Sequence, residues 1–96
     1  MFDHIDIDPK NINLPNSEWN KDELKESCVA YEQTIEKIGG IDLQILGIGK
    51  NGHIGFNEPG SSFHSKTRVI HLDQQTRMAN LYEWHDLNKV PRTAIT

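Results

Sequence analysis

A glycine-rich loop from Gly47 to Gly60 follows a short apolar run and constrains the fold of this chain more than any other feature. Five glycines fall in it, at positions 47, 49, 52, 55 and 60. Glycine allows positive φ and close approach of the backbone to a ligand, so this density favours a tightly turned loop. One imidazole, His53, and one carboxylate, Glu58, lie within it. These are groups that acid–base chemistry uses, and loops at strand ends often carry such chemistry.

The residues before the loop predict one helix and one strand. Asn20 and Glu23 have the spacing of a capping box, and apolar residues then recur on one helical face, at positions 24, 28, 31, 35 and 38. Gly39 and Gly40 are expected to end the helix. The apolar run Ile41–Leu46 predicts a buried strand, and this helix–glycine–strand order favours a parallel sheet.

Shorter elements are expected elsewhere. Asp73 is expected to cap a helix. The remaining patterns predict strands at Asn11–Leu14, Lys66–Leu72 and Thr93–Thr96, a turn at Pro15–Ser17, a helix at Gln74–Leu81 and a loop at Trp84–Lys89.

These elements cannot make a complete layered domain, because a parallel sheet needs helices on both of its faces. One long helix cannot supply them. The sequence therefore predicts that the 96 residues are a piece of a larger α/β domain with a parallel sheet.

Composition excludes several classes of protein. The 96 residues carry a net charge of −4 with no basic cluster, which argues against binding to nucleic acid or to an anionic membrane. No apolar stretch of 18 residues and no signal peptide is present, so a cytoplasmic protein is expected. Cys28 is the single cysteine, which rules out an internal disulfide and a cysteine-based zinc cluster. The other histidines have no metal-binding spacing.

Two nucleotide-binding interpretations of the loop fail. Gly47–Gly52 matches G-x-G-x-x-G, but a dinucleotide site needs a helix to begin there, and Gly55, Pro59 and Gly60 deny one. A Walker A loop fails because His53 stands where it needs a lysine followed by serine or threonine. A structural loop histidine remains the simplest alternative, and the glycine density argues for function instead.

The stretch Gly47–Ser62, GIGKNGHIGFNEPGSS, closely resembles the signature of the glucosamine-6-phosphate deaminase (isomerase) family. The resemblance extends over essentially the whole chain and keeps the family's order, through Phe2–Ile7, Lys10–Leu14, Ser65–Val69, Thr76–Asn80, Asn88–Pro91 and Ala94–Thr96. It implies that residues 1–96 are the central segment of a single α/β domain, part of a parallel, Rossmann-like sheet in a larger doubly wound fold. Enzymes of the family convert an amino-sugar phosphate to fructose 6-phosphate and ammonia during amino-sugar catabolism.

The resemblance also implies roles for residues of the loop. His53 would be the acid/base that opens the sugar ring, Glu58 would orient it, and Asn51 would complete the catalytic set. Gly49 and Gly52 would bind substrate. In regulated members, Ser61 and Arg68 would belong to an allosteric site. No metal or organic cofactor is implied, and a homo-oligomer is possible.

Four departures from the family pattern qualify these roles. Many members have Asp where Asn51 stands, so one negative charge is absent from that position. The family's Ser-Arg, whose arginine grips the substrate phosphate, is replaced by Leu81 and Tyr82. Ile70 occupies a position that is Lys in allosterically regulated members. Finally, nothing in Met1–Lys50 matches the family's phosphate loop or its proton-abstracting carboxylate motif, so the isolated chain is expected to be inactive.

Two alternatives stay open at this point. One is a sugar-phosphate lactonase or isomerase of related fold, which would not need His53 and Glu58 in this frame. The other is a non-catalytic remnant that binds a sugar phosphate, which the Leu81–Tyr82 segment favours slightly.

Overall fold

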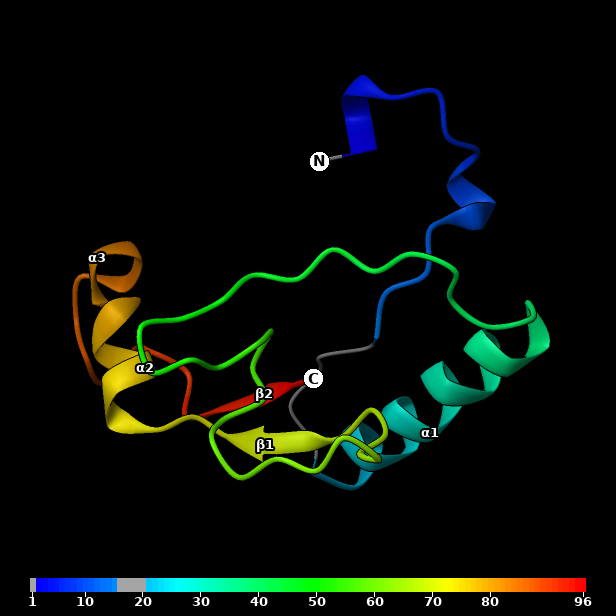
Figure 1. Cartoon of the computed structure of the whole chain (residues 1–96). Coiled ribbons are helices and arrows are strands. Elements are labelled where there is room, and N and C mark those ends of the chain that lie inside the picture. The colour runs from blue at the N-terminus through cyan, green and yellow to red at the C-terminus, as the bar shows by residue number, and fades with distance from the viewer. Residues whose placement is uncertain (1, 16–20) are drawn as a thin grey trace.

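The computed structural model describes residues 2–15 and 21–96, and its main elements are a long helix, a two-stranded sheet and two short helices (Figure 1). In chain order the elements are η1 (Phe2–His4), η2 (Pro9–Asn11), α1 (Lys21–Lys37), β1 (Val69–His71), α2 (Gln74–Ala79), α3 (Leu81–Trp84) and β2 (Thr93–Ile95). None of the helices in the described part of the chain is long and apolar enough to cross a membrane.

Helix α1 confirms the helix expected from the apolar spacing. Cys28, on the predicted apolar face, is only 4% exposed. Gly39 and Gly40 end the helix with φ of +97° each, and the backbone N–H of Gly40 donates to the carbonyl of Ile35 over 2.9 Å. This is the left-handed termination that glycine makes inexpensive. Asn20 of the expected capping box, and residues 16 and 17 of the expected turn, lie outside the described residues.

Strands β1 and β2 form an antiparallel pair, with Val69 opposite Ile95 and His71 opposite Thr93. Both strands were expected, with slightly wider bounds. Glu32 of α1 ties the helix to the start of this sheet, because its carboxylate accepts from the backbone N–H (2.5 Å) and the hydroxyl (2.6 Å) of Thr67. These hydrogen bonds, led by the one from the hydroxyl, lower the pKa of Glu32.

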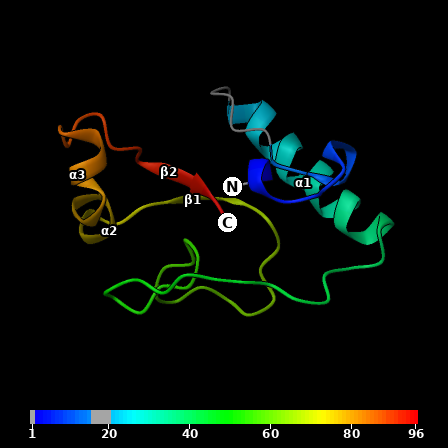
Figure 2. The ribbon, with the colours of Figure 1, turned by 90° about the horizontal axis from the view of Figure 1, so that it is seen from above.

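The strand predicted at Ile41–Leu46 is wrong for this chain, since no strand is assigned there. The segment crosses from the end of α1 toward α2 (Figures 1 and 2), and its side chains face solvent, with Leu43 82% and Ile45 91% exposed. A strand needs a neighbour to take up its backbone hydrogen bonds, and no described segment pairs with this one. The only sheet among the described residues is antiparallel, so the expected parallel sheet is not observed.

The strand predicted at Asn11–Leu14 is also wrong, because η2 covers its first residue and no strand follows. Pro9 stands at the first helical position and the Asp8 carboxylate accepts from the backbone N–H of Lys10 over 3.1 Å. A proline in the first turn, preceded by a capping aspartate, starts a helical turn rather than a strand.

The chain buries little of its own surface. It exposes 8194 Å², whereas a folded monomer of 11.0 kDa exposes about 5,600 Å² by the usual mass scaling. Among the described residues, the buried ones are Cys28, Thr76 and Val90. One of these three, Thr76, is polar, and it lies at the site built by the glycine-rich loop.

Candidate active site

The glycine-rich loop is a tight, hydrogen-bonded turn, as its composition predicts. The backbone N–H of Gly49 donates to the carbonyl of His53 over 2.8 Å, and that of Gly55 donates to the carbonyl of Gly47 over 3.0 Å. Gly52 has φ of +84°, a left-handed conformation that most side chains disfavour. No helix begins between residues 52 and 60, which confirms the argument against a dinucleotide site.

Gly49 is required by the packing of the His53 ring. A Cβ atom at position 49 would lie 2.1 Å from Cε1 and 2.3 Å from Nε2 of His53, far inside normal contact. The ring therefore rests directly on the Gly49 backbone, and glycine is the residue that leaves it room.

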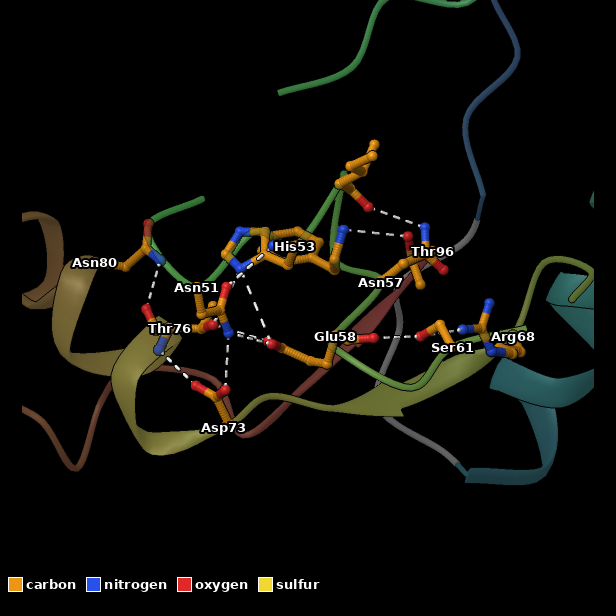
Figure 3. A network of polar contacts seen from close by, with 12 residues as sticks. Asn51, His53, Asn57, Glu58, Ser61, Arg68, Asp73, Thr76, Asn80 and Thr96 are labelled. Atoms are coloured by element: carbon orange, nitrogen blue, oxygen red, sulfur yellow. Dashed lines mark hydrogen bonds and ion pairs between the residues drawn. The ribbon is translucent and has the colours of Figure 1, made fainter. Parts of the chain in front are cut away.

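His53 and Glu58 lie near each other but are not directly hydrogen bonded. His53 Nδ1 and Glu58 Oε2 are 3.9 Å apart, and the two side chains are 15% and 17% exposed. The Thr76 hydroxyl bridges them: it donates to Glu58 Oε1 over 2.8 Å and lies 3.3 Å from His53 Nδ1 (Figure 3). Glu58 is thus linked to His53 by hydrogen bonds that run through a third side chain, Thr76.

Asn51 joins the loop to the start of α2. Its side-chain amide donates to Glu58 Oε2 over 2.7 Å and to Asp73 Oδ2 over 3.0 Å. Its Oδ1 accepts from the backbone N–H of His53 over 3.1 Å. An amide can do all three because it has two donor hydrogens and an acceptor oxygen. Asn51 therefore holds two carboxylates and the histidine backbone together (Figure 3).

The N-terminal turn of α2 supplies the other side of the site. Asp73 caps this helix, as predicted, by accepting from the backbone N–H of Thr76 over 2.7 Å. This bond is the main cause that lowers the pKa of Asp73. Asn80 Nδ2 donates to the carbonyl of Thr76 over 2.8 Å at the far end of the helix. No three His, Cys, Asp or Glu side chains in the described ranges gather in a way that could hold a metal ion.

Comparison with known proteins places this arrangement in a family. No family model matches the chain. Glucosamine-6-phosphate deaminase of Oceanobacillus iheyensis is 53% identical over all 96 residues, and glucosamine-6-phosphate deaminase 1 of Bacillus subtilis is 48% identical over the same length. A solved structure of a monomeric glucosamine-6-phosphate deaminase, described as a missing link of the NagB superfamily, superposes with a TM-score of 0.89 at 48% identity over 99% of this chain.

The chain belongs to the glucosamine-6-phosphate deaminase family. It spans 38% of the O. iheyensis relative, 39% of the B. subtilis relative and 39% of the solved chain. At the coarse level its fold is that of an α/β segment of this family.

The remaining residues singled out by the family resemblance follow the loop in the chain. Arg68 Nη2 donates to Ser61 Oγ over 3.2 Å, and Ser61 Oγ donates to the carbonyl of Glu58 over 2.7 Å. These two residues are therefore brought together, next to the loop and away from the His53 ring (Figure 3). Tyr82, at the position where the resemblance implies a phosphate-binding arginine, lies on α3 and is 71% exposed.

Sequence reasoning missed Thr76 and Asp73 as parts of the site. Asp73 was expected only to cap a helix, and Thr76 only to match a family pattern. They lie 18 and 22 residues from Glu58 and Asn51 along the chain, and the contacts exist because α2 folds back against the loop. No local sequence pattern signals these contacts, because they depend on how α2 packs against the loop.

Proposed function

We propose that the protein containing these residues is an amino-sugar-phosphate deaminase that converts glucosamine 6-phosphate to fructose 6-phosphate and ammonia, in the catabolism of N-acetylglucosamine. The observation that carries this proposal is the His53 ring, seated on Gly49 and linked to Glu58 through Thr76, within a loop that carries the family signature. The names of relatives about 50% identical over the whole chain support the substrate.

In this proposal His53 opens the sugar ring by moving a proton to the ring oxygen, and Glu58 orients the imidazole. Asn51 holds both carboxylates and the backbone of His53 in place. Gly49 and Gly52 let the loop backbone approach the substrate closely. The base that removes the C2 proton comes from a part of the family fold that this sequence does not match, so turnover needs that part as well.

The proposal extends to the complete domain. Ile41–Leu46 would pair there as a buried strand of a parallel, Rossmann-like sheet, with residues 1–96 as the central segment of a doubly wound domain. The exposed apolar side chains of this run and the 38% coverage of a full-length relative support that placement. We further propose a cytoplasmic enzyme that works without metal or organic cofactor. Ser61 and Arg68 would form a polar pair without allosteric function, because Ile70 replaces the lysine of regulated members.

A substrate panel tests the function. The protein, expressed from its complete gene, is given glucosamine 6-phosphate, and ammonia and fructose 6-phosphate are measured together; a 6-phosphogluconolactone assay runs beside it. Equimolar release of ammonia and fructose 6-phosphate is expected. Hydrolysis of the lactone without ammonia release would instead identify a lactonase, and binding of glucosamine 6-phosphate without turnover would identify a non-catalytic remnant.

A further inference from the structure

Thr76 has an environment that packing alone does not explain. Thr76 is 2% exposed, less than the apolar Val90 (3%) and less than Cys28 (4%), although its side chain carries a hydroxyl. Burying a hydroxyl costs free energy unless it is hydrogen bonded. The two partners of this hydroxyl belong to the residues proposed to open the sugar ring: Glu58 Oε1 at 2.8 Å and His53 Nδ1 at 3.3 Å.

The number of hydrogens available decides the direction of the two hydrogen bonds that the Thr76 hydroxyl makes. A threonine hydroxyl has one hydrogen to give and lone pairs with which to accept, whereas an ionised carboxylate can only accept. The Thr76 hydrogen therefore goes to Glu58, and the Thr76 oxygen is left to accept from the N–H of His53 Nδ1. A separation of 3.3 Å is long for such a bond, as catalytic hydrogen bonds often are before substrate binds.

This assignment fixes the other ring nitrogen. With the hydrogen of the neutral imidazole on Nδ1, the lone pair is on Nε2, which has no hydrogen-bond partner within residues 2–15 and 21–96. The direct separation of 3.9 Å between Nδ1 and Glu58 Oε2 is too long for Glu58 to set this arrangement alone. The charged groups facing His53 are Glu58 from the loop and, through Asn51, Asp73 from the start of α2.

We propose that Thr76 is a positioning residue that links His53 to Glu58 and holds the imidazole with its hydrogen on Nδ1, so that Nε2 is the atom that exchanges protons with the sugar. The proposal rests on the function proposed above. Ring opening moves one proton from the C1 hydroxyl to the ring oxygen as the bond between C1 and that oxygen breaks. Nε2 takes this proton from the C1 hydroxyl and gives it to the ring oxygen, which leaves the imidazole unchanged at the end of the step.

Substitution of Thr76 tests the link in the protein expressed from its complete gene. Thr76→Val keeps the shape but removes the hydroxyl, and kcat for ammonia release is expected to fall about 10²-fold with KM changed little, because a mispositioned catalytic group costs about that much. Thr76→Ser keeps the hydroxyl and should stay within about tenfold of the wild-type kcat. Thr34→Val is the matched control, because the Thr34 hydroxyl only bonds back to the Ala30 carbonyl within α1. Wild-type kcat in Thr76→Val would overturn the proposal.

A second measurement does not depend on the variants folding. In ¹⁵N-labelled wild-type protein with a neutral His53 imidazole, Nδ1 should have the chemical shift of a nitrogen that bears hydrogen, and Nε2 that of a nitrogen that does not. The opposite assignment would overturn the proposal. If the wild-type protein releases no ammonia, the proposed function fails, whereas this spectroscopic result still decides the role of Thr76.

Discussion

Replacing Gly49 with alanine should disable the site by displacing a single side chain. The new Cβ would lie 2.1 Å from Cε1, 2.3 Å from Nε2 and 2.6 Å from Nδ1 of His53. Carbon atoms in contact normally stay about 3.5–4.0 Å apart, so the ring must retreat by roughly 1.5 Å. That movement is large enough to break the 3.3 Å contact between His53 and Thr76.

The magnitude follows from this displacement. Misplacing a catalytic group by about 1 Å can cost about 10²-fold in rate, so kcat for Gly49→Ala should fall at least about 10²-fold. Forcing an extra methyl group into a packed site also costs about 1–3 kcal/mol of stability. Steady-state ammonia release from glucosamine 6-phosphate and thermal unfolding, both on the protein from its complete gene, measure the two effects separately.

Gly47→Ala is the control, because a Cβ at Gly47 meets nothing within 4 Å and the backbone there does not have positive φ. It should keep the wild-type kcat and melting temperature. A Gly49→Ala enzyme as active and as stable as the Gly47→Ala enzyme would refute the packing of the His53 ring described above.

Two further predictions concern carboxylates. Asn51→Asp would put a third carboxylate against Glu58 and Asp73 and should lower kcat, whereas adding Asp73→Asn should restore part of the loss. Strictly additive effects of the two substitutions on kcat would show that the Asn51 amide does not join these two carboxylates. Glu32→Gln should lower the melting temperature at neutral pH, because the hydrogen bonds from Thr67 lower the folded-state pKa of Glu32. That stabilisation is present above the unfolded pKa of about 4.3 and is lost as pH falls through the folded pKa, so the difference in melting temperature should shrink in acid; a difference independent of pH would refute it.

Local signals predicted the parts of the fold that local interactions determine. The apolar spacing of α1, its end at Gly39 and Gly40, and the cap at Asp73 all depend on residues within one or two turns. The shape of the glycine-rich loop was predictable for the same reason. In each case the hydrogen bonds that define the element join residues close in the sequence.

The parts of the fold and of the site that were not predicted depend on contacts between residues that are distant in the sequence. Ile41–Leu46 has the composition of a buried strand, yet a strand forms only where a neighbour accepts and donates its backbone hydrogen bonds. His53 and Glu58 lie five residues apart in the loop, whereas the Thr76 hydroxyl that hydrogen bonds to Glu58 comes from a helix 18 residues beyond Glu58. No periodicity or spacing rule reports a contact of that kind.

Replacing His53 with glutamine tests whether His53 moves the proton that opens the sugar ring. Ammonia release and equilibrium binding of glucosamine 6-phosphate are measured for the wild-type and variant proteins, each expressed from the complete gene. The His53→Gln variant should bind the sugar phosphate with nearly wild-type affinity and lose at least about 10²-fold in kcat, since one positioned acid/base contributes about 10²–10⁴. A wild-type kcat in this variant would show that His53 does not move that proton.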